Sequence, residues 1–313
     1  MVSVTLLAGG VGGAKMAEGL AAVEGVELTV IGNVADDCAF HGLWVSPDID
    51  TVTYTLADII NRKQGWGLAD ESTRALQMLE RFGEATWMTL GDADLGLHIY
   101  RTMRRARGDR PTQIAADIAR ALGVGPRIIL PTDDPVQTRL RTSIGELGFQ
   151  EYFVRERCAP TVTGIWFEGA DAARPTPEAL EAIAQADLLV IAPSNPLVSI
   201  DPILAVAGLR DAMIAAATPV VAVSPLIAGK TIKGPAARMM ESTGLEASAL
   251  GIARHYAGLI DRLLIDSVDA GLADAVRESG IDPVVCPIVM ADLAAKRSVA
   301  MQVLHAGQVD LAA

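Results

Sequence analysis

Four glycines near the start of the chain form a segment whose composition suits the binding of an anion. A strand is expected over Val2–Ala8 and a helix over Met16–Ala22, and the segment between them contains Gly9, Gly10, Gly12, Gly13 and Lys15. Glycine lets the backbone turn sharply and approach a ligand closely. The helix that follows directs its unpaired N–H groups and its positive dipole end at the same point. The sequence therefore predicts a phosphate-binding loop here.

This loop departs from the two common nucleotide-binding patterns. Gly10 and Gly12 match the first two glycines of the dinucleotide fingerprint G-x-G-x-x-G, but Lys15 stands at the third glycine position. No Gly-Lys-Ser/Thr sequence follows, as a Walker loop requires. These departures favour a nucleotide ligand of another type. A tight turn between strand and helix, without a ligand, is the alternative interpretation.

Pairs of acidic residues recur in segments that are expected to be loops. The pairs are Asp36 and Asp37, shortly after Asn33, which is itself a candidate for substrate binding; Asp48 and Asp50; Asp92 and Asp94; and Asp133 and Asp134. Ligands of open α/β sheets bind where the strands end, and hard cations such as Mg²⁺ take oxygen ligands. The pairs therefore predict a Mg²⁺ site, whereas each pair taken alone is also typical of helix caps and turns.

Polar and basic groups of other kinds are expected elsewhere. Ser194 and Asn195 follow a predicted strand, and Lys233 precedes a helix, which suits phosphate or nucleobase recognition as well as ordinary turns. The histidines, which are His41, His98, His255 and His305, show no close metal-ligand spacing, so neither a metal nor a hydrolase role is expected. A cluster of arginines at helical spacing is expected to be a solvated face: Arg101, Arg104, Arg105, Arg107 and Arg110.

Apolar runs that resemble buried strands alternate with helical segments, which is typical of a parallel α/β sheet. Further strands are expected at Leu28–Val34, Arg127–Leu130, Leu188–Ala192, Val220–Val223, Leu263–Asp266 and Val284–Cys286, and helices at Thr51–Asn61, Glu71–Phe82, Leu95–Arg107 and Thr112–Leu122. We expect one Rossmann-like three-layer domain over 1–313, with its core at 1–45 and 125–313 and a helical insertion at about 46–124. Gln137–Thr142 and Thr161–Phe167 alternate in polarity and are expected to extend an edge.

Composition excludes several classes of protein. The 313 residues carry a net charge of −12, which disfavours a nucleic-acid partner. The three cysteines lie far apart and suggest neither a disulfide framework nor a zinc site. No basic segment precedes the first apolar residues, and prolines interrupt the longest uncharged stretch. A cytoplasmic protein without a membrane span is therefore expected.

Taken together in chain order, the loops resemble the 2-phospho-L-lactate transferase family of coenzyme F-420 biosynthesis, which includes CofD and its actinobacterial form FbiA. The similar segments are LLAGGVGGAKMAEGL, IGNVADD, SPDIDTVTYTLA, TLGDADLGLHIYR, PTDDPVQTRLRT, GFQEYFVRERCAPTV, IAPSNPLVSIDPIL and VSPLIAGKTIKGPAARMM. The resemblance implies a homodimer that binds Mg²⁺ and a guanylylated donor. It also implies transfer of a phosphorylated three-carbon acid to the ribityl hydroxyl of the deazaflavin FO, with release of GMP.

The resemblance also implies roles for single residues. The glycines at 10–13 should contact the donor diphosphate, Ser194 and Asn195 the nucleotide, and Thr89, beside Gly91 and Asp92, the deazaflavin. Asp50 should contact FO and the metal. Asp36 and Asp37 are further candidates to bind the metal or the ribityl chain, or to orient the attacking hydroxyl. Lys15 and Lys233 are candidates to balance the charge of the phosphates. A sugar-nucleotide-binding regulator of the YvcK-like gluconeogenesis-factor type is the alternative, and an NAD-dependent dehydrogenase ranks third.

Overall fold

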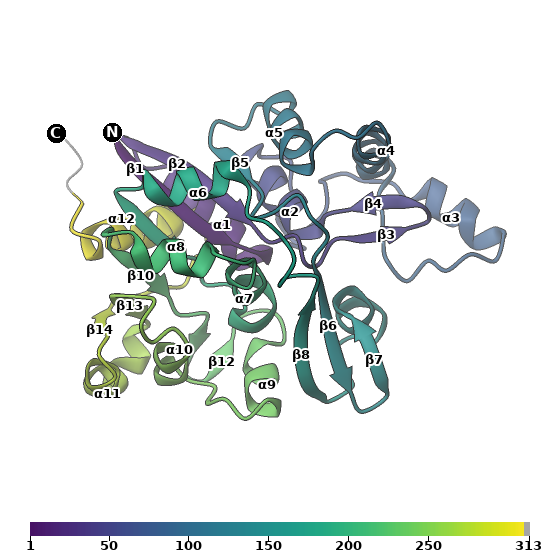
Figure 1. Ribbon diagram of the computed structural model, residues 1–313. Helices are drawn as coiled ribbons and strands as arrows, with labels where there is room; N and C mark the ends of the chain where they lie inside the picture. The colour runs from purple at the N-terminus through teal and green to yellow at the C-terminus, as the bar shows by residue number, and fades with distance from the viewer. Residues whose placement is uncertain (310–313) are drawn as a thin grey trace.

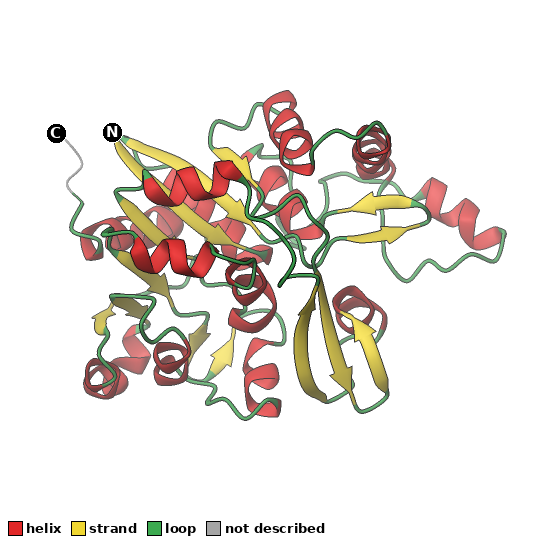
Figure 2. Cartoon of the chain, viewed as in Figure 1, coloured by secondary structure: helices red, strands yellow, loops and turns green. Residues whose placement is uncertain are grey.

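A seven-stranded parallel sheet forms the centre of the computed structural model, which describes residues 1–309 (Figures 1 and 2). In spatial order the strands are β14 (Asp282–Val285), β13 (Arg262–Ile265), β10 (Val220–Val223), β9 (Leu188–Ile191), β1 (Val2–Ala8), β2 (Val26–Gly32) and β5 (Arg127–Ile129). Every neighbouring pair is parallel. All seven predicted buried strands are therefore confirmed, with ends displaced by at most two residues.

The order of the strands creates a crevice at one point of the sheet. From β1 the chain builds outward through β2 and β5, then returns to β9 on the other side of β1 and builds outward again to β14. The connections that leave the carboxyl ends of β1 and β9 therefore diverge to opposite faces of the sheet. Such a switch point is where open α/β sheets bind ligands.

Helices cover both faces of the sheet, which confirms the three-layer arrangement. One face packs against α1 (Gly10–Ala21), α2 (Pro47–Leu56), α5 (Pro111–Ala121) and α12 (Leu293–Ala306). The other packs against α6 (Pro177–Ala184), α7 (Asp201–Leu204), α8 (Leu209–Ala215) and α10 (Ala249–His255). Apolar side chains that alternate along the strands enter the two cores in turn, as Leu6 and Leu7 do.

Between β2 and β5 the chain forms the four predicted helices, with one addition. They are α2, α3 (Arg74–Arg81), α4 (Asp92–Ala106) and α5, and a hairpin of β3 (Cys38–Phe40) and β4 (Leu43–Val45) precedes them. Both α2 and α4 begin three or four residues earlier than expected, so the two acidic pairs there lie in first helical turns instead of loops. Carboxylates are favourable in that position because they face the positive end of the helix dipole.

The predicted extension of the sheet edge is wrong. β6 (Gln137–Thr142) and β8 (Val162–Glu168) instead form a separate antiparallel sheet with β7 (Gly145–Gly148), which lies apart from the central sheet in Figure 1. A π-helical turn at Glu151–Arg155 connects β7 to β8. The remaining elements are β11 (Leu226–Ile227), β12 (Lys230–Thr231), α9 (Ala236–Ser242), α11 (Ala273–Glu278) and short helical turns at Pro196–Ile200 and Ser267–Leu272. Over residues 1–309, no helix combines the length and apolar character of a membrane span.

The packing of α1 against α12 depends on a glycine. A Cβ at Gly19 would lie 2.8 Å from the carbonyl carbon of Lys296 on α12, whereas a Cβ at Gly96 on α4 would meet open space. We expect Gly19→Ala to lower the free energy of unfolding by about 1–3 kcal/mol through overpacking. The matched Gly96→Ala should raise it by roughly 0.5–1 kcal/mol through lower chain entropy. Thermal melting of both variants checks the pair, and an unchanged Gly19→Ala would contradict the close packing.

Candidate active site

A cavity of about 760 Å³ opens at the switch point of the sheet. Its wall is built by the start of α1, the first turn of α2, the start of α4, and the segments that follow β9 and β10. Most of the sequence-predicted site residues lie on it: Gly10, Gly12, Lys15, Asp36, Asp50, Thr89, Ser194, Asn195 and Lys233. Gly13, Asn33, Asp37 and Asp92 do not. The topology therefore gathers loops that are far apart in sequence into one place.

The glycine-rich segment is the beginning of α1 and not a loop before it. The helix starts at Gly10, whose φ of +62° favours glycine. A Cβ on Gly12 would collide with the carbonyl oxygen of Pro193, and one on Gly13 would lie 2.8 Å from the Cβ of Ala8. Gly12 and Gly13 are thus required by the close approach of the β1 and β9 connections, so a side chain at Gly12 would disturb the protein itself. The backbone of Gly10 hydrogen-bonds to the carboxylate of Asp48. The other N–H groups of the first turn have no partner within the helix and can face an anion.

Ser194 joins the two sides of the crevice. Its hydroxyl donates a hydrogen bond to the Gly9 carbonyl at 2.7 Å. The N–H of Gly9 donates in turn to the Ser194 hydroxyl oxygen at 3.3 Å. The side-chain oxygen of Asn195 accepts from the N–H of Leu197 and caps the following helical turn. Both residues therefore have structural roles at the rim of the cavity.

Three buried carboxyl groups, those of Asp36, Asp48 and Asp50, line the cavity, and the exposed fractions of these residues are 4–8%. Burial raises the pKa of Asp36 well above its ordinary value, and the neighbouring Asp48 adds to the effect. Burial also raises the pKa of Asp48 to about 6, although a hydrogen bond from the Asn33 amide at 2.9 Å favours the ionised form and partly offsets this rise. Asn33 thus supports Asp48 from behind the wall. Within residues 1–309, Oδ1 of Asp36 has no hydrogen-bond partner.

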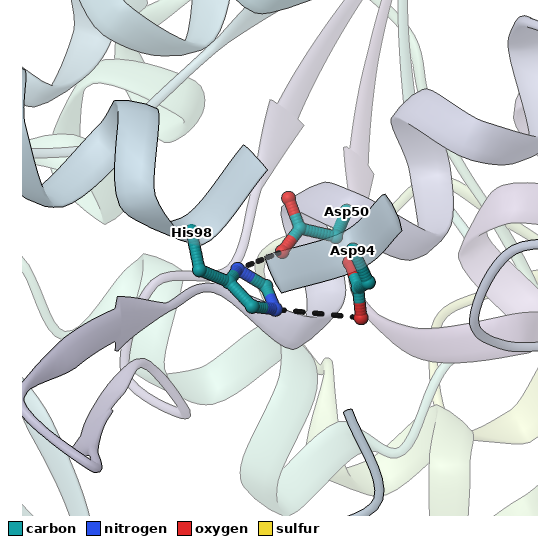
Figure 3. Close-up of side chains that lie close together, drawn as sticks. All are labelled: Asp50, Asp94 and His98. Carbon is teal, nitrogen blue, oxygen red and sulfur yellow. Dashed lines mark ion pairs between the residues drawn. The ribbon is translucent and has the colours of Figure 1, made fainter. Parts of the chain in front are cut away.

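Asp50, Asp94 and His98 form a second group on the same wall (Figure 3). One donor atom of each lies within 4.8 Å of the others, so the group has ligands of the kind a metal ion takes. Burial raises the pKa of Asp50, although the charge of Arg101 opposes this. Burial opposes ionisation of Asp94 too, but its contacts with His98, Tyr54 and Arg101 outweigh burial, and its pKa is lowered.

Sequence reasoning missed His98 and misjudged Arg101. The absence of a second histidine at metal-ligand spacing removed His98 from consideration, yet Asp94, His98 and Arg101 are spaced by four and three residues on one face of α4. That spacing was the available signal. The expected solvated arginine face is wrong for Arg101, which is 5% exposed, whereas Arg107 and Arg110 are exposed.

Several predicted acidic site residues hold the protein together instead. Oδ2 of Asp37 accepts hydrogen bonds from Ser46 at 2.7 Å and from the Trp44 indole at 3.1 Å. Asp92 accepts from the backbone N–H groups of Arg74 and Ala75 at the start of α3. Asp133 accepts from the N–H of Thr112 and from Arg110, and Asp134 accepts from the N–H of Arg174. The positions of Asp37 and Asp92 correct the expectation that they face the ligands.

Two lysines place positive charge on the cavity wall. Burial, followed by the charges of Lys296 and Lys233, lowers the pKa of Lys15. Lys233 donates through Nζ to the carbonyl oxygen of Gln64 and so reaches across from the β10 side to the segment after α2. We call the wall around Lys15 and Lys233 the basic side of the cavity, and the wall at Asp36, Asp50 and Asp94 the acidic side. Asp48 reaches the glycine turn, where a Cβ at Gly9 would lie 2.6 Å from its Oδ2.

Comparison with known proteins identifies relatives along almost the whole chain. The family model described as 2-phospho-L-lactate transferase CofD matches residues 4–305. A phosphoenolpyruvate transferase of Streptomyces griseus is 39% identical, covering 96% of this chain and 97% of the relative. A 2-phospho-L-lactate transferase of Methanopyrus kandleri is 37% identical, covering 81% of both chains.

Solved structures share the fold at much lower identity. Two crystal structures of a Bacillus halodurans protein of the UPF0052 family superpose with TM-scores of 0.65 and 0.63, at 17% and 18% identity. They cover 97% of this chain and 99% and 98% of theirs. At this identity the likeness shows the α/β fold alone.

The buried Asp37 makes the stability of the protein depend on pH. Burial raises its pKa from 3.8 to about 7, so the folded state binds a proton that the unfolded chain releases near pH 4. Proton binding by Asp37 therefore adds no more than about 4 kcal/mol to the free energy of unfolding. This stabilisation is fully present below about pH 4 and is lost as the pH rises through 7. We expect Asp37→Asn to be more stable than the wild type at pH 8 and to flatten this dependence. Denaturant unfolding from pH 4 to pH 8 measures both, and an identical slope in the variant would contradict the assignment.

Proposed function

The chain belongs to the CofD family of 2-phospho-L-lactate transferases, and we propose that it transfers a phosphorylated three-carbon acid from a guanosine diphosphate-linked donor to the deazaflavin FO. In this reaction the ribityl hydroxyl of FO attacks the phosphorus that carries the acid, and the bond from that phosphorus to GMP breaks. The product is an intermediate of coenzyme F-420 biosynthesis. The observation that carries the proposal is one cavity whose wall combines the first turn of α1, two lysines and several buried acids.

The donor fits the basic side of the cavity. The first turn of α1 offers backbone N–H groups to a diphosphate, and Lys15 and Lys233 supply positive charge on the same wall. Ser194 and Asn195 lie next to this turn, at the end of β9. We assign GDP binding to these residues.

The acceptor fits the acidic and aromatic side. Asp50 and Thr89 lie on the wall together with the apolar and aromatic groups Met88, Leu90, Phe149 and Phe153. The two phenylalanine rings stack with centroids 5.5 Å apart. Such a wall suits a flat deazaflavin ring, while a carboxylate beside it can orient a ribityl hydroxyl and accept its proton.

A divalent cation suits this donor set. Oδ1 of Asp36 is a buried carboxyl oxygen without a partner in the described part of the chain, and Asp50 lies on the same wall. These oxygens are the hard ligands that Mg²⁺ prefers. When bound, Mg²⁺ would supply charge neutralisation at the transferred phosphoryl group. We propose Asp36 and Asp50 as its protein ligands.

The relatives favour an enolpyruvyl donor. The Streptomyces relatives that match 96% of this chain are named phosphoenolpyruvate transferases, whereas the Methanopyrus relative matches 81%. The lactyl donor is the second candidate and the glyceryl donor the third. A homodimer is part of the proposal through the family resemblance. A sugar-nucleotide-binding regulator is less well supported, because relatives with 36–40% identity are named transferases.

Mass analysis of reaction products tests the proposed function. The protein is incubated with FO and each guanylylated donor, with Mg²⁺ or with EDTA. We expect an FO-phospho-acid product and GMP with the enolpyruvyl donor, and none in chelator. Full activity in EDTA would remove the metal from the proposal. Absence of product with all three donors, together with thermal stabilisation by UDP-sugars, would favour the regulator.

Two adjacent aspartates provide a matched test of the acidic wall. Asp36 lies on the cavity and Asp37 lies behind it, and both are buried. We expect Asp36→Asn to lower turnover about a hundredfold or more, because the proposed Mg²⁺ loses a carboxylate ligand beside the reacting phosphoryl group. Its melting temperature should not fall, since a neutral amide replaces a buried acid of raised pKa. Asp37→Asn should keep its turnover. Equal turnover in the two variants would contradict this division of roles.

A further inference from the structure

We propose that Arg101 and His98 are positioning residues that fix the carboxylate of Asp50 toward the acceptor. The inference rests on the proposed function. Arg101 forms a two-pronged ion pair with Asp50, in which Nη2 donates to Oδ1 and Nη1 donates to Oδ2 at 3.1 Å. A planar fork of this kind fixes both the direction and the plane of a carboxylate.

Arg101 acts from behind the cavity. Asp50, Asp94 and His98 line the cavity, but Arg101 does not; it lies beside Asp37, Trp44 and Ser46. Its Nη1 also approaches the Trp44 carbonyl oxygen at 3.4 Å. The guanidinium therefore has no place to touch a substrate directly, and any effect it has on the reaction must pass through Asp50.

The contacts of the two ring nitrogens define the orientation and tautomer of His98. Nη1 of Arg101 lies 3.2 Å from Nδ1 of His98, and because arginine has no acceptor, Nδ1 must accept. The ring proton then lies on Nε2, which is 3.3 Å from Oδ2 of Asp94 (Figure 3). Tyr54 donates its hydroxyl to the other oxygen of Asp94. Arg101 is thus held from two sides, by Asp50 and by a histidine that is itself fixed.

This chain of contacts connects two helices across the acidic wall. Asp50 lies in the first turn of α2, while Asp94, His98 and Arg101 lie along α4. The side chains of His98 and Arg101 are 0% and 6% exposed, so solvent does not compete for their contacts. The angle at which Asp50 faces the cavity is therefore set by α4 and not by its own helix alone.

The test uses Arg101→Lys, because Asp50→Asn would remove the positioned group itself and leave a buried arginine unpaired. Lysine keeps the charge but loses the fork. We expect kcat with FO to fall about tenfold or more through misplacement of Asp50. The calorimetric affinity for GDP, which binds on the other side, should stay within about twofold of the wild type. Arg104→Lys is the matched control on α4, where the arginine pairs with Asp109 and Asp117 outside the cavity.

A histidine pair keeps the inference testable if Arg101→Lys does not fold. His98→Asn retains an acceptor for Arg101, whereas His98→Leu removes it, so we expect higher turnover in the asparagine variant with similar GDP affinity in both. A kcat of Arg101→Lys that equals that of Arg104→Lys, or equal turnover in the two histidine variants, would overturn the positioning role alone. A wild-type protein that forms no product from FO would overturn the proposed function, and this inference would fail with it.

Discussion

Burial of carboxyl groups at the carboxyl edge of the central sheet is the constraint on which the rest of the site depends. Removing an ionised carboxylate from water is unfavourable unless hydrogen bonds or opposite charges compensate. Here the compensation differs from one acid to the next. Asn33 donates a hydrogen bond to Asp48, and Arg101 forms an ion pair with Asp50. Oδ1 of Asp36 has no partner among the described residues. These differences decide which acids are fixed in place and which are available to a ligand.

The start of α1 and the segment that follows β9 are joined by backbone contacts that leave little room for side chains. Gly12 and Gly13 let α1 approach the β9 connection, and Ser194 joins that connection to the carbonyl of Gly9. Because α1 also packs directly against α2, the helix start that would receive a diphosphate is held in a fixed position relative to the acids of α2. Such fixed geometry matters in phosphoryl-type transfer, where most of the catalytic effect comes from positioning and charge.

The strands could be predicted from sequence because each is a short run of β-branched or leucine residues buried on both faces, as in Leu188–Ile191. The cavity wall could also be anticipated, since residues at strand ends such as Asp36 and Ser194 meet at the switch point. The roles of Asp37 and Asp92 could not be predicted from sequence, because a carboxylate that caps a helix or anchors a loop has the same local sequence as one that faces a ligand. Arg101 was equally hidden, since only the packing of α4 against α2 and the β3–β4 hairpin shows which arginine of the cluster is buried.

The central claim is that one cavity holds the donor nucleotide and the acceptor at the same time, on opposite sides. Calorimetric titration of FO into protein saturated with GDP and Mg²⁺, compared with titration into the protein with Mg²⁺ alone, tests it most directly. We expect FO to bind in both titrations, with an affinity that GDP leaves unchanged or increases. Loss of FO binding in the presence of GDP would show that the two ligands compete for one place, and would contradict the account.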